Sequence, residues 1–246
     1  MTKLNWCRAN APSALANSTD EEILAAMSDA YERFGKLDGA SLTAIDMAKR
    51  SLVDSIYKSA NLEGLGTTFP KTEAILNNAP TASTAEEINF VINMKRAWQF
   101  LLDNIDYPIS MMLLRELNKI CLTNLSYNGG ALRGVPVSIG GTSWIPPMPD
   151  AAYIRDKIEE IYAMNNSELK ALKYFCFIAR TQMFIDGNKR LAQLIANKVL
   201  IEDNIGIFQI DVIQTDRFIE LLLNYYEIDN DNSIIQFMLN NCIKRI

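Results

Sequence analysis

The sequence predicts a mainly α-helical protein with one small β-hairpin. Apolar side chains recur at helical spacing through most of the 246 residues, as they do in helices that bury one face. The pattern changes between residues 127 and 149, where paired glycines bracket a β-branched run and two prolines follow. This composition is typical of a hairpin whose pairing ends at the prolines. We therefore expect a helical bundle that carries a single hairpin.

The expected helices follow one another through short connections. The first, residues 20–34, comes directly after the capping residues Ser18 and Thr19. Pro108 is expected in the first turn of the helix that reaches Ile120, because its fixed φ suits that position. The other helices are expected at residues 42–60, 81–102, 150–164, 167–181, 189–202, 215–226 and 233–246.

The hairpin is expected from the strands Val135–Ile139 and Ser143–Ile145. We expect two parts in the chain. Residues 1–80 form an N-terminal helical segment, and residues 81–246 form a core with the hairpin and a helical C-terminal end.

The composition excludes several classes of function. The formal net charge is -5, which argues against a nucleic-acid partner and against docking on an anionic membrane. The chain contains no histidine, so a histidine base and histidine-built zinc sites are excluded. Acid–base chemistry would fall to Asp, Glu, Lys, Tyr or Cys.

The cellular compartment is expected to be the cytoplasm. The chain has no run of about 18 apolar residues and no apolar leader segment, so we expect neither membrane spanning nor secretion. No C-x-x-C pair occurs, and we expect free, buried thiols at Cys7, Cys121, Cys176 and Cys242.

One segment has the residue types of a phosphate site. Residues 167–181 are almost wholly apolar, and a second apolar helix follows Asp186-Gly187-Asn188-Lys189-Arg190 at once. A glycine turn that opens into a helix N-terminus presents backbone N–H groups to an anion, and the two basic residues add charge. Asp186 is an oxygen ligand suited to Mg²⁺. An ordinary helix–helix corner with a glycine cap explains the same residues.

The string Gln182-x-Phe184-x-Asp186-Gly187-Asn188-Lys189-Arg190 resembles the signature of the Fic (Fido) family, H-x-F-x-[DE]-G-N-[GK]-R-x-x-R. The resemblance implies a Fic-like helical bundle with a hairpin flap. It implies protein adenylyltransferase ancestry, since most members transfer AMP from ATP to a hydroxyl group of a protein. ATP or another nucleoside triphosphate would bind with Mg²⁺ held by Asp186, and Gln182 and Asn188 would stand at the catalytic positions. The residues that the resemblance assigns to the phosphates are Gly187, Asn188, Lys189, Arg190 and Gln193.

Two further segments resemble the family in the same order along the chain. Residues 130–147 are similar to the flap, along which a protein target binds, and residues 59–64 match the inhibitory motif [ST]-x-x-x-E-[GN]. A plain surface hairpin and a helix cap at Gly64 are the alternatives. The assigned flap residues are Arg133, Val135, Val137, Ile139 and Trp144, and the assigned inhibitory residues are Ser59, Glu63 and Gly64.

The chain departs from the family pattern at two positions, and a third residue distinguishes branches of the family. Gln182 replaces the histidine that deprotonates the target hydroxyl, and an amide has no useful basicity near pH 7. Gln193 replaces the last arginine, so we expect Glu63 to lose its cationic partner and to keep at most an amide hydrogen bond from Gln193. Lys189 stands where most AMP-transferring members have glycine and resembles the Doc branch, which transfers phosphate.

Three functions remain open from the sequence. The first is a nucleotide-binding pseudoenzyme of Fic fold. The second is a slow or altered transferase of NMP or phosphate, or an enzyme that removes AMP from a protein. The third is a partner-binding module that uses the flap edge to dock an extended peptide. A homo-oligomer is compatible with each of them.

Overall fold

The computed structural model describes residues 4, 7–8, 15, 17–34 and 43–246. The chain divides into two compact units, residues 1–42 and 43–246. In the smaller unit, helix α2 (Asp20–Phe34) forms at the predicted residues, and Ile23 and Met27 pack with Cys7. The division lies before the helix that carries the inhibitory motif, so residues 43–80 belong to the larger unit by their contacts, whereas the motifs suggested a boundary after residue 80.

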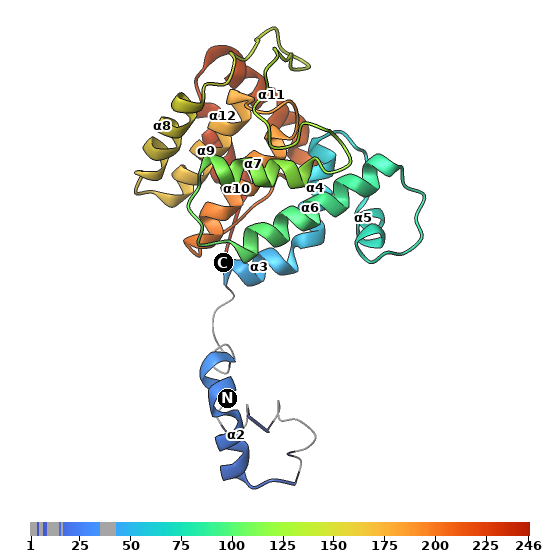
Figure 1. Cartoon of the computed structure of the whole chain (residues 1–246), viewed down its shortest axis with the longest axis vertical. Helices are drawn as coiled ribbons and strands as arrows, with labels where there is room; N and C mark the ends of the chain where they lie inside the picture. The colour runs from blue at the N-terminus through green and yellow to red at the C-terminus, as the bar shows by residue number, and fades with distance from the viewer. Residues whose placement is uncertain (1–3, 5–6, 9–14, 16, 35–42) are drawn as a thin grey trace. The chain divides into compact units, whose positions relative to one another are not determined.

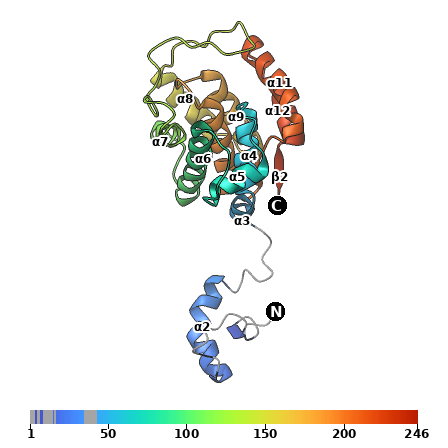
Figure 2. The same ribbon diagram turned by 90° about the vertical axis from the view of Figure 1, so that its right-hand side faces the viewer.

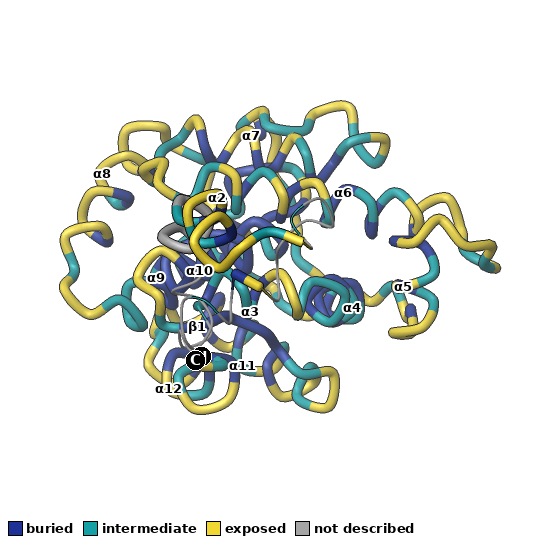
Figure 3. The backbone as a smooth tube through the Cα atoms, turned by 90° about the horizontal axis from the view of Figure 1, so that it is seen from below, coloured by how far each residue is buried: buried dark blue, intermediate teal, exposed yellow. Residues whose placement is uncertain are grey.

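The larger unit is a bundle of helices around one buried pair (Figure 1). The pair consists of α9 (Ser167–Thr181) and α10 (Asn188–Glu202), and α10 is buried almost along its whole length. The apolar residues around most of each helix explain this central place, because a surface helix exposes one face to water. Figure 3 shows the buried tube at the centre and exposed chain around it. The other elements are α3 (Ala44–Arg50), α4 (Leu52–Leu62), α5 (Phe69–Leu76), α6 (Ala85–Asp103), α7 (Met111–Cys121), α8 (Ala151–Tyr162), β1 (Gly206–Phe208), η3 (Val212–Gln214), α11 (Thr215–Ile228), α12 (Asn232–Asn241) and β2 (Ile243–Arg245).

The mainly helical class with one small sheet is confirmed, but the sheet lies elsewhere than predicted. The two strands are β1 and β2, which pair antiparallel with Ile207 opposite Lys244. Residues 134–149, where the hairpin was expected, contain no strand. The predicted C-terminal helix ends at Asn241 because the last residues turn back to pair with β1.

Residues 134–149 form an extended loop, which we call the flap, and it crosses the top of the larger unit to α11 (Figure 2). Thr142 Oγ1 donates a hydrogen bond to Glu227 of α11 at 2.9 Å. The two ends of the flap are joined by the side chain of Arg133 and not by backbone hydrogen bonds between strands. The Arg133 guanidinium donates to the backbone carbonyls of Val135, Pro146 and Pro147. Since prolines have no N–H to donate, this side chain replaces the missing backbone pairing.

Several helix boundaries differ from the prediction for local reasons. The helix expected over residues 42–60 breaks at Ser51 into α3 and α4. Ser110 caps α7, so Pro108 precedes the helix and does not lie in its first turn. The structure adds α5, a short helix with Pro70 near its start that the sequence analysis did not expect. Among the described residues, no helix is long and apolar enough to cross a membrane.

Candidate functional site

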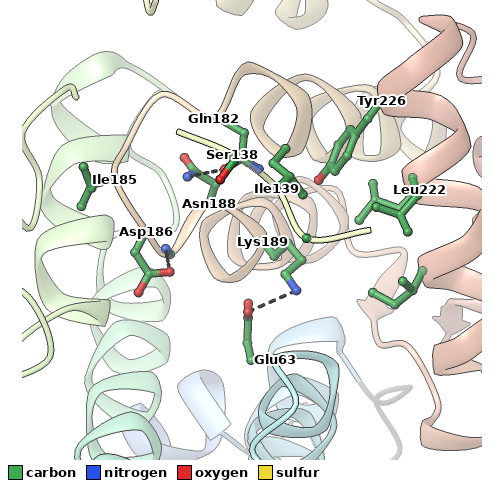
Figure 4. Close-up of a pocket in the computed structure, with 14 residues that line it drawn as sticks. Glu63, Ser138, Ile139, Gln182, Ile185, Asp186, Asn188, Lys189, Leu222 and Tyr226 are labelled. Carbon is green, nitrogen blue, oxygen red and sulfur yellow. Dashed lines mark hydrogen bonds and ion pairs between the residues drawn. The ribbon is translucent and has the colours of Figure 1, made fainter. Parts of the chain in front are cut away.

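A cavity of about 340 Å³ lies where the flap, the corner between α9 and α10, helix α11 and the end of α4 meet (Figure 4). The flap contributes Ser138–Gly140, and α4 contributes its C-cap residue Glu63. The corner contributes most of its residues between Gln182 and Lys189. The structure therefore brings three segments together that are distant in the sequence: the inhibitory motif, the flap and the phosphate motif.

The corner between α9 and α10 is built by two residues in left-handed conformation and one asparagine. Gln182 ends α9 with φ 46°, and Gly187 precedes α10 with φ 77°. Between them, the Asn188 side chain accepts from Phe184 N at 3.0 Å and donates to Phe184 O at 2.8 Å. Asn118 of α7 fixes the same loop from outside by donating to Asp186 O at 2.9 Å. Asn188 therefore shapes the turn, which holds the neighbouring residues in place.

Gln182, at the position of the family's histidine, is bonded within the protein. Its Nε2 donates to Ala179 O at 2.7 Å, and its Oε1 accepts from Asn188 Nδ2 at 3.0 Å. Burial raises the pKa of the neighbouring Tyr226 hydroxyl far above its usual range, against a smaller opposing effect of the Gln182 side chain. Neither side chain can accept a proton near pH 7.

The first turn of α10 provides donors for an anion. Its N-cap, Gly187, has no side chain to satisfy the first backbone N–H groups, and no side-chain cap bond is present. These N–H groups and the helix dipole favour a negative group at this end of the cavity. Lys189 lines the cavity beside them. The Gly187 N–H is already bonded to Asp186 Oδ1, and the anion site at residues 187–190 stays a prediction.

Glu63 has a cationic partner, contrary to the expectation from the sequence. Lys189 Nζ lies 3.2 Å from Glu63 Oε2, as Figure 4 shows, and also donates to Leu62 O at 3.3 Å. Glu63 Oε1 is 4.0 Å from Arg190 Nε, and both of these buried atoms have no hydrogen-bond partner. The lysine of the phosphate motif thus binds the last carbonyl and the C-cap carboxylate of α4. The expectation failed because Lys189 had been assigned to phosphates alone.

Arg190 points away from the cavity floor toward α6 and α7. Its Nη2 pairs with Asp186 Oδ2 at 2.7 Å, and its Nη1 donates to Cys121 O at 3.3 Å. The guanidinium lies over the Phe90 ring, 5.4 Å from the centroid. Burial opposes the charge of Arg190, but the carboxylates of Glu63 and Asp186 outweigh this effect and raise its pKa. Arg190 therefore holds Asp186 and the corner in position.

Asp186 lies at the edge of the cavity with both carboxylate oxygens in use. Oδ1 accepts from the backbone N–H of Gly187, and Oδ2 pairs with Arg190. Within the described part of the chain, no three acidic, histidine or cysteine side chains gather as they would to hold a metal ion. A single carboxylate suits Mg²⁺ when substrate phosphates and water supply the other ligands. The residues present fit a shared ion and not a metal cage.

Gln193 lies outside the cavity. Its side chain is buried between α4 and α10, and its Nε2 donates to Ser59 Oγ at 3.3 Å. The Ser59 hydroxyl of the inhibitory motif is therefore used in helix packing. Gly64 follows the C-cap with φ +78°, a conformation that glycine adopts without strain.

The flap residues divide into inner and outer ones. Arg133 is buried, and besides the flap carbonyls its Nε binds Gln182 O at 2.6 Å. Trp144 is half-buried and stacks on Tyr226, with ring centroids 5.6 Å apart. Val135 is exposed, whereas Val137 and Ile139 are half-buried. The exposed side of the flap includes Val135, Ile145 and Met148, and Arg133 is an internal brace.

The sequence analysis missed the α11 side of the cavity. Ile219, Leu222, Leu223 and Tyr226 line it and supply its apolar wall. The sequence analysis predicted a helix over residues 215–226 and assigned none of its residues to the site. Leu222 and Tyr226 are buried and Ile219 and Leu223 are half-buried, so the spacing of these residues does not distinguish a cavity wall from a core face.

Comparisons with known proteins agree with this geometry. A family model described as the Fic/DOC family matches residues 108–200. A comparison with curated protein sequences found no match. At the level of fold, Fic-1 from C. elegans matches with a TM-score of 0.65 at 18% identity, covering 93% of this chain and 70% of that chain.

Two bacterial structures are similar in the same way. A Fic family protein from Desulfovibrio desulfuricans G20 has a TM-score of 0.69 at 16% identity, covering 93% of this chain and 71% of that chain. A Fic domain containing signaling protein from Bacteroides thetaiotaomicron has a TM-score of 0.64 at 20% identity, covering 87% and 91%. At these identities the likeness concerns the fold. Residues 108–200 therefore resemble the Fic/DOC family, and the chain has the fold of these solved Fic structures.

Proposed function

We propose that this protein binds a nucleoside triphosphate, ATP or a relative, in the cavity between the flap and α10 and that its transfer chemistry is strongly impaired. The observation that carries the proposal is the state of Gln182. It occupies the position of the family's base, and both ends of its amide are bonded to protein groups. A general base is worth roughly 10²–10⁴-fold in rate, so loss of the base predicts a loss of that order.

The parts of the cavity match the parts of a nucleotide. The N-terminus of α10 and Lys189 suit phosphates, and the wall of Ile219, Leu222 and Leu223 suits a base. Asp186 would hold Mg²⁺ together with the phosphates, and the ion would supply charge neutralisation there. Arg190 would keep Asp186 in place, as it does through the 2.7 Å contact.

The flap is the proposed contact for a protein target. Within residues 134–149, no backbone group forms a hydrogen bond with another backbone group. An unpaired, extended segment of this kind binds a peptide by adding it as a neighbouring strand. A partner would thereby lie across the mouth of the cavity, and a slow transferase remains the alternative activity to a pure binding function.

Two experiments test the proposal. Calorimetric titration of the full chain with ATP and Mg²⁺ should give saturable heat, and the variant Lys189→Gln should weaken it. Labelled ATP should give little self-labelling in the wild type and more in Gln182→His combined with Glu63→Gly. Absence of nucleotide heat at millimolar ATP would contradict the binding function. Wild-type labelling equal to that of the double variant would contradict the impairment.

A further inference from the structure

A second cavity lies on the other side of Trp144, away from the nucleotide cavity. It has a volume of about 370 Å³ and lies between the C-terminal limb of the flap, the start of α8, the end of α9 and the end of α11. Four aromatic side chains line it: Trp144, Tyr153, Phe177 and Tyr225. A volume above about 300 Å³ is in the range of small-ligand sites. Nothing in the proposed nucleotide chemistry uses this cavity.

The cavity already contains one cation that belongs to the chain. The Arg180 guanidinium lies over the Trp144 ring, 4.6 Å from its centroid, and 5.8 Å from the centroid of Tyr225. It also pairs with Asp229 through Nη1 and Oδ1 at 3.0 Å. The walls therefore bind a guanidinium in the way that such groups are bound elsewhere, on aromatic faces beside a carboxylate.

Two carboxylates at the cavity have binding capacity left. Asp150 caps α8, and both of its hydrogen bonds, to the N–H groups of Ala152 and Tyr153, use Oδ1. Asp229 uses Oδ1 for Arg180, and its side chain is 66% exposed. Against these two negative charges, Arg180 supplies the positive charge among the lining residues. The cavity therefore has a net negative charge and aromatic walls, a combination that favours a second cation.

We propose that this cavity, which we call the Trp144 pocket, binds an arginine side chain of the protein that docks on the flap. The inference rests on the proposed target binding for the identity of the partner, because the pocket is continuous with the flap through Trp144 and Pro147. The guanidinium of the partner lies against Tyr153 and Phe177, the aromatic lining residues that Arg180 does not cover, and donates to Oδ2 of Asp150 or Asp229. The pocket thereby selects targets with an arginine beside the segment that lies along the flap.

The probe is the peptide acetyl-Ala-Arg-Ala-amide, with the glutamine and glutamate peptides of the same length as comparisons. Binding to the full chain is followed by the NMR signal of the Trp144 indole N–H, which the spectrum of Trp144→Phe identifies. The arginine peptide should shift this signal saturably in the millimolar range. The glutamine peptide should bind at least about fivefold more weakly, as expected when a cation–π contact and an ion pair are lost.

Two isosteric substitutions remove the charges and keep the backbone. Asp150→Asn retains an N-cap residue, and Asp229→Asn retains a residue that tolerates its φ of 55°. Together they should weaken the arginine peptide about fivefold. Asp156→Asn is the matched control, because it removes an exposed charge of α8 that does not line the pocket. Each single variant is measured as well, so that the prediction can still be tested if the double variant does not fold.

Several outcomes would overturn the proposal. They are equal binding of the arginine and glutamine peptides, tighter binding of the glutamate peptide, no saturable shift at all, or equal weakening by Asp156→Asn. Calorimetry with ATP separates this proposal from the nucleotide function, because the variants at Asp150 and Asp229 should bind ATP like the wild type. If the wild type binds ATP but does not bind the arginine peptide, the proposal for the Trp144 pocket fails and the nucleotide proposal stands.

Discussion

Lys189 and Glu63 form an ion pair between the first turn of α10 and the end of α4, with 3.2 Å between Nζ and Oε2. The side chains are 27% and 18% exposed, so the pair is largely shielded from water and salt. Lys189 also lines the cavity proposed for the phosphates. Residues 59–64 and the phosphate motif therefore share one charge, and under the proposed function a nucleotide would compete for it.

The first prediction concerns the charge of Glu63. Glu63→Gln should tighten the binding of ATP and should change the affinity for AMP less, because the phosphate tail is the part of the nucleotide that meets a carboxylate there. A released Lys189 contributes about 0.5–2 kcal/mol to a phosphate contact at this exposure. Calorimetric titrations with ATP, ADP and AMP measure the effect. Equal affinities of both proteins for all three nucleotides would leave Glu63 as a simple helix cap.

The second prediction concerns the coupling between the two residues. If Glu63 acts through Lys189, the gain from Glu63→Gln should disappear when Lys189 is also changed to Gln. The double-mutant cycle should therefore give a coupling free energy of about 1 kcal/mol for ATP binding. Arg115→Gln, a change at an exposed position of α7, is the control. Its effect on the free energy of ATP binding should add to that of Glu63→Gln without coupling. Additive effects of Glu63→Gln and Lys189→Gln would show that the two side chains act separately.

The third prediction concerns Gln193. This side chain is buried against Ser59, and the neighbouring internal space has only about 10 Å³. Gln193→Arg restores the family's residue but forces a larger, charged group into this interface, which costs about 1–3 kcal/mol. We expect a lower thermal midpoint for Gln193→Arg and a partial return of stability in Gln193→Arg combined with Ser59→Gly. Unchanged stability of the single variant would show that an arginine reaches the cavity freely from this position.

The fourth prediction concerns the flap brace. Arg133 donates to backbone carbonyls at both limbs of the flap and at Gln182. Arg133→Met leaves these carbonyls without their donor and should destabilise the protein by about 2 kcal/mol. It should also accelerate protease cleavage within residues 134–149. Arg155→Met, at an exposed position of α8, should change neither urea stability nor cleavage. A cleavage pattern identical to that of the wild type would contradict the role of Arg133.

The fifth prediction concerns alkaline pH. Burial raises the pKa of the Cys121 thiol to about 12, and burial also raises the pKa of Cys176. An unfolded thiol titrates near pH 8.5, so the unfolded state loses its proton first as pH rises. The stabilisation is complete below about pH 8.5 and is lost progressively toward pH 12.

Urea unfolding at pH 7.5 and 10.5 measures this loss. At the higher pH, Cys121 alone should cost about 2–3 kcal/mol. The variant Cys121→Ala should therefore lose less stability than the wild type between the two pH values. Equal losses in both proteins would show that this thiol titrates normally.

The sequence was sufficient for the central helices and for the corner between them. Residues 167–181 and 188–202 are recognisable because their apolar residues surround the helix and a glycine in left-handed conformation separates them. The flap was misassigned because extended residues pair only where a partner offers donors and acceptors. Arg133 and the proline pair decided this through contacts that local patterns do not encode.

The contacts of the candidate site were less predictable than its residues. Glu63 and Lys189 are distant in sequence, and each had a plausible partner assigned from the family pattern. Lys189 and Gln193 are one turn apart and both contact α4, so the position of α4 along α10 decides that Lys189 meets the carboxylate while Gln193 meets Ser59. The position of a helix that is buried almost all round follows from packing with several neighbours, and its own pattern of apolar residues does not determine it.

The carboxylate of Glu63 behaves as a ligand that the chain carries on itself. A tethered ligand has a fixed effective concentration, so its occupancy does not change when the protein is diluted. Under the proposed function, a nucleotide would compete with this carboxylate at every protein concentration, and its apparent affinity would be the intrinsic affinity multiplied by the fraction of molecules in which Lys189 is free. With about one molecule in ten open, the measured dissociation constant is about tenfold weaker than that of the open site. An inhibitor bound from solution would dissociate on dilution, whereas the ion pair of Glu63 with Lys189 forms to the same extent at any protein concentration.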